Sequence, residues 1–242
     1  MIAQFINQQI TEGKKIFALL IDPDHHNDLS LTNTIKLANE SKVDLILVGG
    51  SILQNSIEHT IELIKKQSSI PVILFPGNIL QISDKADGIM LLSLISGRNP
   101  DLLIGNHVIA ASSLKKSNLE ILPTGYMLID GGKITSVEYM SNTKPIPSDK
   151  TDIAISTAMA GEMLGLKYIY LEAGSGATKK PSTQIIKGVK KNITIPLIIG
   201  GGLKTTSDIK HAIDAGADII VVGSAVEENP TILPELVNGC RI

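Results

Sequence analysis

Side chains with oxygen atoms that could bind a metal follow two neighbouring apolar runs of the sequence. Asp22 and Asp24 directly follow Ile16–Ile21, and a neighbouring run ends in Val48-Gly49-Gly50 followed by Ser51. Carboxylate and hydroxyl oxygens are hard ligands of the kind that Mg²⁺ prefers, above all when the metal is shared with a diphosphate. The competing interpretation is that the acids only shape a turn or cap the next segment, because Asp-Pro favours turns.

Glu172 is the acid best placed for proton transfer. It follows the apolar residues Ile169–Leu171 and precedes the glycine-rich stretch Ala173–Ala177, so we expect its side chain at the mouth of a site. A carboxylate there can orient a polyol and accept a hydroxyl proton. Two plainer alternatives are a structural acid paired with a nearby lysine and, for Tyr170, a place in the core.

Two glycine-rich turns predict a phosphate site. One is Gly200–Gly202 after Ile199, and the other is Gly223-Ser224 after Val222. Glycine lets the backbone approach a ligand and point N–H groups at phosphate oxygens, and a helix starting after Ser224 would add its positive end. Alternatively, these glycines only close tight turns between strand and helix.

Histidine and cysteine offer little further chemistry. His25 and His26 are adjacent, so they point in different directions, and no third partner follows at ligand spacing, which disfavours a transition-metal site. His59 falls in a surface-helix pattern, and His107 lies in an irregular segment and is assigned no role. Cys240 is the only cysteine, which excludes an intramolecular disulfide and a cysteine-based zinc site.

Eight short apolar runs alternate with helical patterns, which is typical of a parallel sheet buried on both faces. The predicted strands are Ile16–Ile21, Val43–Val48, Pro71–Phe75, Gly88–Leu92, Ile121–Ile129, Tyr168–Leu171, Pro196–Ile199 and Asp218–Val222. Eight such units in 242 residues favour a closed (β/α)8 TIM barrel over a doubly wound open sheet, which is the alternative. Functional residues then lie at the carboxyl ends of the strands.

Two connections depart from the regular pattern. Only a short stretch joins Phe75 to Gly88, and it contains a Pro-Gly pair, so we expect a reduced or missing third helix. The long polar stretch Asp130–Lys150 predicts an extended loop or a cover over the site. We predict that residues 1–242 form a single TIM-barrel domain.

The composition excludes several functions. Lys and Arg number 22 against 24 acidic residues, and aromatic residues make up 3% with no Trp, so nucleic-acid binding is disfavoured. No apolar run approaches the length of a membrane span, and the N-terminus lacks a signal-peptide pattern. We therefore expect a cytoplasmic protein with no transmembrane segment, which can still take a lipid substrate from a membrane surface by transient contact.

Taken in order, these motifs resemble the geranylgeranylglyceryl phosphate synthase family, including the PcrB-like heptaprenylglyceryl phosphate synthases. The similar segments span nearly the whole chain: LLIDPDHH at 19–26, DLILVGGS at 44–51, PVILFPGN at 71–78, SGRNPDLLIG at 96–105, YLEAGSGA at 170–177, IIGGGLKT at 198–205 and VVGSAVEEN at 221–229. The AGSGA form is similar to the archaeal-type group with bacterial members. PcrB-like members have a lysine where this chain has Leu20.

The resemblance implies a TIM barrel with a reduced third helix and an Mg²⁺-dependent prenyltransferase that acts as a homo-oligomer. Such an enzyme joins the C3 hydroxyl of sn-glycerol 1-phosphate to a polyprenyl diphosphate, here expected to be geranylgeranyl diphosphate, through an ether bond and releases diphosphate. Asp22 and Ser51 match the metal positions, and from the chemistry of this reaction we expect Asp22 and Glu172 to be the catalytic residues. The implied sn-glycerol 1-phosphate site consists of Tyr170, Leu171, Glu172, Ala173, Gly174, Ser175, Gly176, Gly200, Gly201, Gly202, Gly223 and Ser224.

Two other functions fit a phosphate-binding barrel. An isomerase or aldolase would use a catalytic lysine at a strand end or paired acids on opposite strands, and only Asp130 could pair with Asp22 from the fifth strand. A non-catalytic protein that holds a phosphorylated lipid precursor would not require both Asp22 and Glu172.

Overall fold

A computed structural model describes residues 1–241 of the chain. Eight parallel strands pair in sequential order, and β8 pairs with β1 to close the barrel. The strands are β1 (Ile16–Ile21), β2 (Leu45–Val48), β3 (Val72–Leu74), β4 (Gly88–Leu94), β5 (Glu120–Leu128), β6 (Tyr168–Glu172), β7 (Leu197–Gly200) and β8 (Ile219–Val222). The predicted (β/α)8 barrel and all eight predicted strands are confirmed, with strand ends unchanged in β1 and shifted by one or two residues elsewhere.

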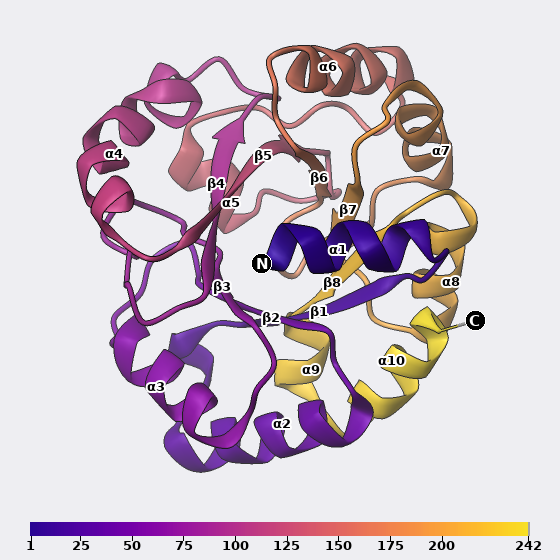
Figure 1. Cartoon of the computed structure of the whole chain (residues 1–242). Helices are drawn as coiled ribbons and strands as arrows, with labels where there is room; N and C mark the ends of the chain where they lie inside the picture. The colour runs from indigo at the N-terminus through magenta and orange to yellow at the C-terminus, as the bar shows by residue number, and fades with distance from the viewer. Residues whose placement is uncertain (242) are drawn as a thin grey trace.

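Helices cover the outside of the barrel (Figure 1). The longer ones are α2 (Asp28–Ser41), α3 (Ile57–Gln67), α4 (Asn106–Lys116), α6 (Thr151–Met163), α7 (Thr183–Asn192), α8 (Thr206–Asp214) and α10 (Leu233–Cys240). The shorter ones are η1 (Pro23–His25), η2 (Asp101–Gly105), α5 (Ser136–Ser141), α9 (Ser224–Glu228) and η3 (Pro230–Ile232). In the described part of the chain, no helix lies between β3 and β4, which confirms the missing third helix, and no helix is long and apolar enough to cross a membrane.

Each strand is buried on both faces because its side chains alternate between two apolar layers. In β4, Met90 and Leu94 belong to the layer inside the barrel, whereas Ile89 belongs to the layer beneath the helices. Helix α1 (Ile2–Thr11) lies across one end of the barrel in Figure 1. Its buried Ile2 and Ile6 join the inner layer, so this end of the barrel is closed.

Carboxylates tie neighbouring strands together at their amino ends. An aspartate just before an even-numbered strand accepts the backbone N–H of the preceding odd-numbered strand, which satisfies a buried donor. The N···O pairs are Phe17–Asp44 at 2.8 Å, Val72–Asp87 at 2.8 Å and Leu197–Asp218 at 2.9 Å. Asp218 is the most buried of the three and also contacts Lys190 at 2.5 Å and Lys15 at 3.4 Å. These links fix the amino ends of the strands and leave the carboxyl ends free for a site.

The substitution Asp218→Ala tests this structural role. It leaves the Leu197 N–H without its acceptor and two lysines without their counterion, so we expect the free energy of unfolding to fall by about 2–3 kcal/mol. Urea unfolding followed by circular dichroism measures the change. Asp149→Ala removes an acid that is 76% exposed and paired only with its neighbour Lys150, and it should leave the unfolding midpoint unchanged. Equal effects of the two substitutions would contradict the assignment.

Candidate active site

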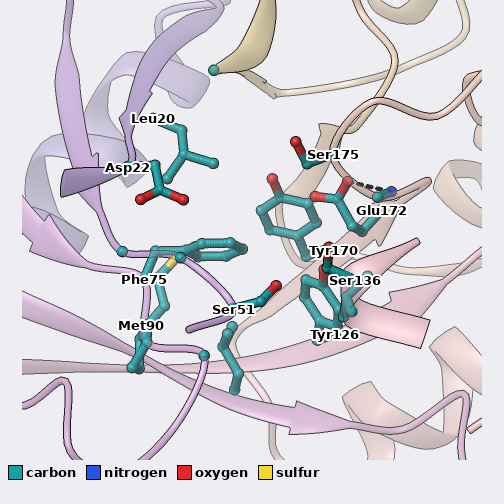
Figure 2. Close-up of a pocket in the computed structure, with 18 of the residues that line it drawn as sticks. Leu20, Asp22, Ser51, Phe75, Met90, Tyr126, Ser136, Tyr170, Glu172 and Ser175 are labelled. Carbon is teal, nitrogen blue, oxygen red and sulfur yellow. Dashed lines mark hydrogen bonds between the residues drawn. The ribbon is translucent and has the colours of Figure 1, made fainter. Parts of the chain in front are cut away.

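A cavity of about 500 Å³ opens at the carboxyl ends of the strands. That volume suits a small-molecule ligand. One side is polar, with Asp22, Ser51, Glu172, Ser175 and Ser224 among its lining residues. Figure 2 shows four of these groups facing a common space: Asp22 and Ser51 follow β1 and β2, Glu172 ends β6, and Ser175 lies in the loop after β6. The closed barrel therefore brings together residues that are far apart in sequence.

The other side of the cavity is apolar and extends to the outer face of β4. Ile89 and Leu91 alternate with the inward-facing Met90 and also line the cavity. Ala110 and Leu114 of α4 also line the cavity and belong to the same apolar layer as Ile89. The space stays open because no helix follows β3, where a regular barrel would pack one. The missing helix therefore creates an apolar channel that is continuous with the polar mouth.

Only one of the two N-terminal acids is free to act in the cavity. The carboxylate of Asp24 accepts the N–H groups of Gln54 at 2.9 Å and Asn55 at 2.8 Å, and Asp24 does not line the cavity. Asp22 lines it, and its Oδ1 accepts the Asp24 N–H at 3.0 Å. Burial raises the pKa of Asp22 above its usual value. The hypothesis of a two-carboxylate site is therefore wrong for Asp24, which instead ties two loops together.

A buried amide fixes the loop that carries Ser51. The Gln81 side chain is 3% exposed, donates to the Gly50 carbonyl at 2.7 Å and accepts the Gly77 N–H at 3.0 Å. A side chain at Gly50 would overlap the carboxylate of Asp22, so glycine keeps the space beside that oxygen open. The loops after β1, β2 and β3 are thus linked to one another, with Asp22 and Ser51 facing the cavity.

Glu172 ends β6 on the opposite wall and is 6% exposed. Its Oε1 accepts the Gly174 N–H at 2.6 Å. Burial raises the pKa of Glu172 to about 7, because desolvation outweighs the stabilisation of the charged form by polar neighbours, above all the hydrogen bond from the Gly174 N–H. Both protonation states are therefore accessible near neutral pH, as a proton acceptor requires.

An aromatic cluster forms the floor beside Glu172. The ring of Tyr170 lies 5.5 Å from that of Phe75 and 5.4 Å from that of Tyr126, measured between centroids (Figure 2). Burial raises the pKa of Tyr170 well above its usual value, so its hydroxyl stays protonated. Tyr170 belongs to the barrel core, as the alternative interpretation held, and it also lines the cavity.

The glycines after β7 are required by packing. A side chain at Gly200 would overlap the Tyr170 hydroxyl, and one at Gly201 would overlap Oε1 of Glu172. Gly201 also has φ +76°, a conformation that other residues rarely adopt. The interpretation that these glycines close a tight turn holds in part, because Gly202 also has a positive φ, of +73°. Packing adds a second requirement, since Gly200 and Gly201 make room for Tyr170 and Glu172, and Gly201 and Gly202 also line the cavity.

Most of the residues predicted for the site line the cavity. They are Asp22, Ser51, Tyr170, Glu172, Gly174, Ser175, Gly176, Gly201, Gly202, Gly223 and Ser224. Three others do not: Leu171 points into the outer layer because it alternates with Tyr170, Ala173 is buried, and Gly200 is covered by Tyr170. Asp130, the acid required by the isomerase hypothesis, accepts the Gly132 N–H at 2.9 Å and also lies outside the cavity.

Several lining residues were not expected from the sequence. Helix α5, within the predicted cover of residues 130–150, contributes Ser136 and Met140. His107 lies on α4, where its Nε2 is 3.1 Å from Ser93 Oγ, and burial lowers its pKa. Helix α4 stands where an irregular segment was predicted. Its residues show only a weak amphipathic pattern, so nothing local indicates a helix that borders a cavity.

His25 also lines the cavity, and its ring is paired with an acid from the far end of the chain. Its Nδ1 lies 2.7 Å from Oε2 of Glu227, which belongs to α9 after β8. The Glu227 carboxylate raises the pKa of His25, whereas burial lowers that of the adjacent His26. The pKa values of the two histidines are therefore shifted in opposite directions. Among the residues described, no three acids, histidines or cysteines form a group that could hold a metal by themselves.

The closed barrel and its cavity at the carboxyl ends of the strands define a TIM-barrel protein with a half-polar, half-apolar ligand site. Comparison with known proteins gives the particular family. The chain belongs to the PcrB family, whose profile matches residues 8–239.

Relatives and a solved structure agree with this assignment. The chain is 51% identical to a geranylgeranylglyceryl phosphate synthase of Spirosoma linguale, over 95% of this chain and 92% of that protein. It is 41% identical to one of Methanosphaera stadtmanae, over 94% and 93% of the two chains. A crystal structure of (S)-3-O-geranylgeranylglyceryl phosphate synthase from Thermoplasma acidophilum in complex with the substrate sn-glycerol-1-phosphate matches with a TM-score of 0.94 and 31% identity. It covers 100% of this chain and 98% of that one.

Gly201→Ala tests the packing requirement around Glu172. The new methyl group would meet the Glu172 carboxyl and the backbone N atoms of Ala173 and Gly174, so it must shift the carboxyl and its loop. We expect at least a tenfold loss of turnover in addition to backbone strain of about 1 kcal/mol. Gly13→Ala is the matched control: Gly13 has a similar φ of +75°, but a side chain there would meet open space. The control should lose stability by a similar strain and keep its turnover. Turnover losses of equal size in both variants would overturn the assignment.

Proposed function

We propose that the protein is a prenyltransferase of the geranylgeranylglyceryl phosphate synthase type. It forms an ether bond between the C3 hydroxyl of sn-glycerol 1-phosphate and C1 of a polyprenyl diphosphate, which we expect to be geranylgeranyl diphosphate, and releases diphosphate. The observation that carries the proposal is the single cavity that joins a polar mouth to an apolar channel. The names of the relatives support it.

The apolar channel suits the prenyl chain. Its walls of Ile89, Leu91, Ala110 and Leu114 offer no charge, and burying a hydrocarbon chain there is favourable by about 25 cal/mol per Å² of apolar surface. The channel opens toward Asp22 and Glu172, so a chain bound in it would bring its diphosphate end to the polar mouth. A phosphosugar has no use for this channel, which weighs against the isomerase or aldolase alternative.

The loops after β7 and β8 suit the phosphate of sn-glycerol 1-phosphate. Gly202, Gly223 and Ser224 line the cavity there, at the strand pair where TIM barrels frequently bind phosphate. The Ser224 hydroxyl lies 2.9 Å from that of Ser175 in the loop after β6, so these loops meet around one space. With the phosphate at this position, the glycerol hydroxyls extend toward Glu172.

The residues on the β1–β2 side fit a magnesium ion shared with a diphosphate. Asp22 and Ser51 would hold it with two oxygen donors, and Gly50 leaves the space beside the Asp22 carboxylate open. Protein sites for Mg²⁺ commonly use one or two carboxylates and take their remaining ligands from substrate phosphates and water. Bound there, Mg²⁺ would neutralise charge on the leaving diphosphate.

Glu172 completes the reaction by removing a proton. The bond between C1 and the diphosphate oxygen breaks, the C3 hydroxyl oxygen bonds to C1, and the hydroxyl proton passes to the Glu172 carboxylate. A pKa of about 7 suits this role because a general base is most effective when its pKa lies near the working pH. The predicted homo-oligomer, cytoplasmic location and transient membrane contact stay predictions.

Product analysis tests the proposed function directly. The protein is incubated with sn-glycerol 1-phosphate, Mg²⁺ and prenyl diphosphates of increasing length, and the products are identified by mass spectrometry. We expect a prenyl ether of glycerol phosphate together with free diphosphate. Binding of both substrates without turnover would instead favour a non-catalytic carrier of a phosphorylated lipid precursor.

Glu172→Gln tests the proton acceptor. The amide keeps the size of the side chain but cannot accept the proton, so we expect kcat to fall by about 100- to 10,000-fold with little change in the binding of prenyl diphosphate. In the unchanged protein the rate should fall as the pH drops through about 7, because protonation inactivates the base. The variant should lack this step in single-turnover measurements across pH. A loss below about tenfold would reduce Glu172 to a binding residue.

Asp22→Asn tests the metal site. Removing the charge weakens a hard ligand, so we expect turnover at limiting Mg²⁺ to fall by more than about 100-fold and the Mg²⁺ concentration for half-maximal rate to rise. Calorimetric binding of sn-glycerol 1-phosphate should change little. Asp24→Asn distinguishes the two acids: the Asp24 carboxylate accepts the backbone N–H groups of Gln54 and Asn55, so this substitution should affect stability more than Mg²⁺ dependence. Unchanged turnover of Asp22→Asn at limiting Mg²⁺ would contradict the assignment.

A further inference from the structure

The pair of His25 and Glu227 lies in the cavity but has no role in the mechanism above. His25 stands three residues after Asp22, and Glu227 stands three residues after Ser224, so the pair bridges the loops after β1 and β8. The Glu227 side chain is 13% exposed, whereas that of His25 is 55% exposed. The carboxylate is thus held in the wall while the ring stays accessible from the open space.

Few basic side chains face this cavity. Among the described residues that line it, they are His25, His107 and Lys204. His107 lies on α4 beside Ser93, and burial there lowers its pKa, which disfavours its cationic form. Lys204 follows β7, on the side assigned to the glycerol phosphate. His25 is therefore the basic group nearest to Asp22 in the chain, on the side where a diphosphate would share a metal with that carboxylate.

The contact to Glu227 fixes the orientation of the ring. With Nδ1 directed at the carboxylate at 2.7 Å, the other ring nitrogen, Nε2, is left to interact with a ligand. A carboxylate in this position favours the imidazolium form, in which Nε2 carries a proton and can donate it in a hydrogen bond. Hydrogen bonds from a cation to phosphate oxygens are among the strongest in proteins.

We propose that His25, oriented by Glu227, donates a hydrogen bond from Nε2 to the diphosphate of the prenyl substrate and stabilises it as it leaves. His25 contacts the leaving group, and Glu227 is a positioning residue that acts through His25. The inference rests on the proposed prenyltransferase function and adds to it a cationic partner for the leaving group that is independent of the metal. No proton is transferred in this step, because the imidazolium only donates a hydrogen bond.

Binding of inorganic pyrophosphate in the presence of Mg²⁺ tests the contact without requiring turnover. In calorimetry, we expect His25→Gln to weaken pyrophosphate binding by about tenfold, as the loss of a charged hydrogen bond implies, and to leave sn-glycerol 1-phosphate binding within about twofold. Glu227→Gln should weaken pyrophosphate binding by about three- to tenfold. The matched control is His59→Gln, which removes a similar exposed pair, His59 with Asp28 at 2.8 Å, outside the cavity, and should change neither affinity.

A further variant, His25→Lys, tests whether Glu227 acts by orienting His25 or only by supporting the structure. His25→Lys restores a cation that needs no orienting partner, so adding Glu227→Gln to it should cause no further loss of pyrophosphate affinity. Thermal unfolding checks that each variant is folded. Pyrophosphate affinity within twofold of the unchanged protein in His25→Gln would overturn the proposal, and so would an equal loss of sn-glycerol 1-phosphate binding. Absence of ether product from the unchanged protein would refute the proposed function instead. The pyrophosphate binding measurements need no turnover, so the two failures can be told apart.

Discussion

The buried carboxyl group of Glu172 is the constraint on which the rest of the site depends. A carboxyl that is 6% exposed is costly to ionise, and it stays ionisable near neutral pH because the Gly174 N–H bonds to it directly. The space that the carboxyl group occupies limits which residues can lie beside it. A side chain at Gly201 would overlap Oε1 of Glu172, so this position requires glycine. The sequence of three glycines after β7 is thus in part a consequence of one acid on β6.

The two ends of the barrel are stabilised by different means. At the amino ends of the strands, α1 closes the barrel and aspartates accept strand N–H groups, with lysines or an arginine as counterions. At the carboxyl ends, the loops are linked to each other by Asp24 and Gln81, whereas Asp22 uses one carboxylate oxygen to accept the Asp24 N–H and lines the cavity together with Ser51. Stability and function are therefore assigned to opposite ends, as in other barrels of this kind.

The missing helix shows how an omission can create a binding site. Because β3 is followed by a short loop, the outer face of β4 lacks the cover that a regular barrel gives it. Ile89, which is 2% exposed, and the partly buried Leu91 line the cavity there, and Ala110 and Leu114 of α4 line it as well. The cavity thus runs from inside the barrel to its outer layer, and an extended apolar ligand can be accommodated without enlarging the barrel.

The sequence by itself determined the strands, the barrel, the missing helix and the placement of Asp22 and Glu172 at strand ends. These features depend on local patterns: strand-length apolar runs, the length of a connection, and the residue that follows a strand. The tertiary structure alone decided that Asp24 bonds to Gln54 and Asn55, that Leu171 faces outward, that His107 borders the cavity, and that His25 meets Glu227, 202 residues away. The physical reason is barrel closure, which sets β8 against β1 and so fixes contacts that no local pattern encodes.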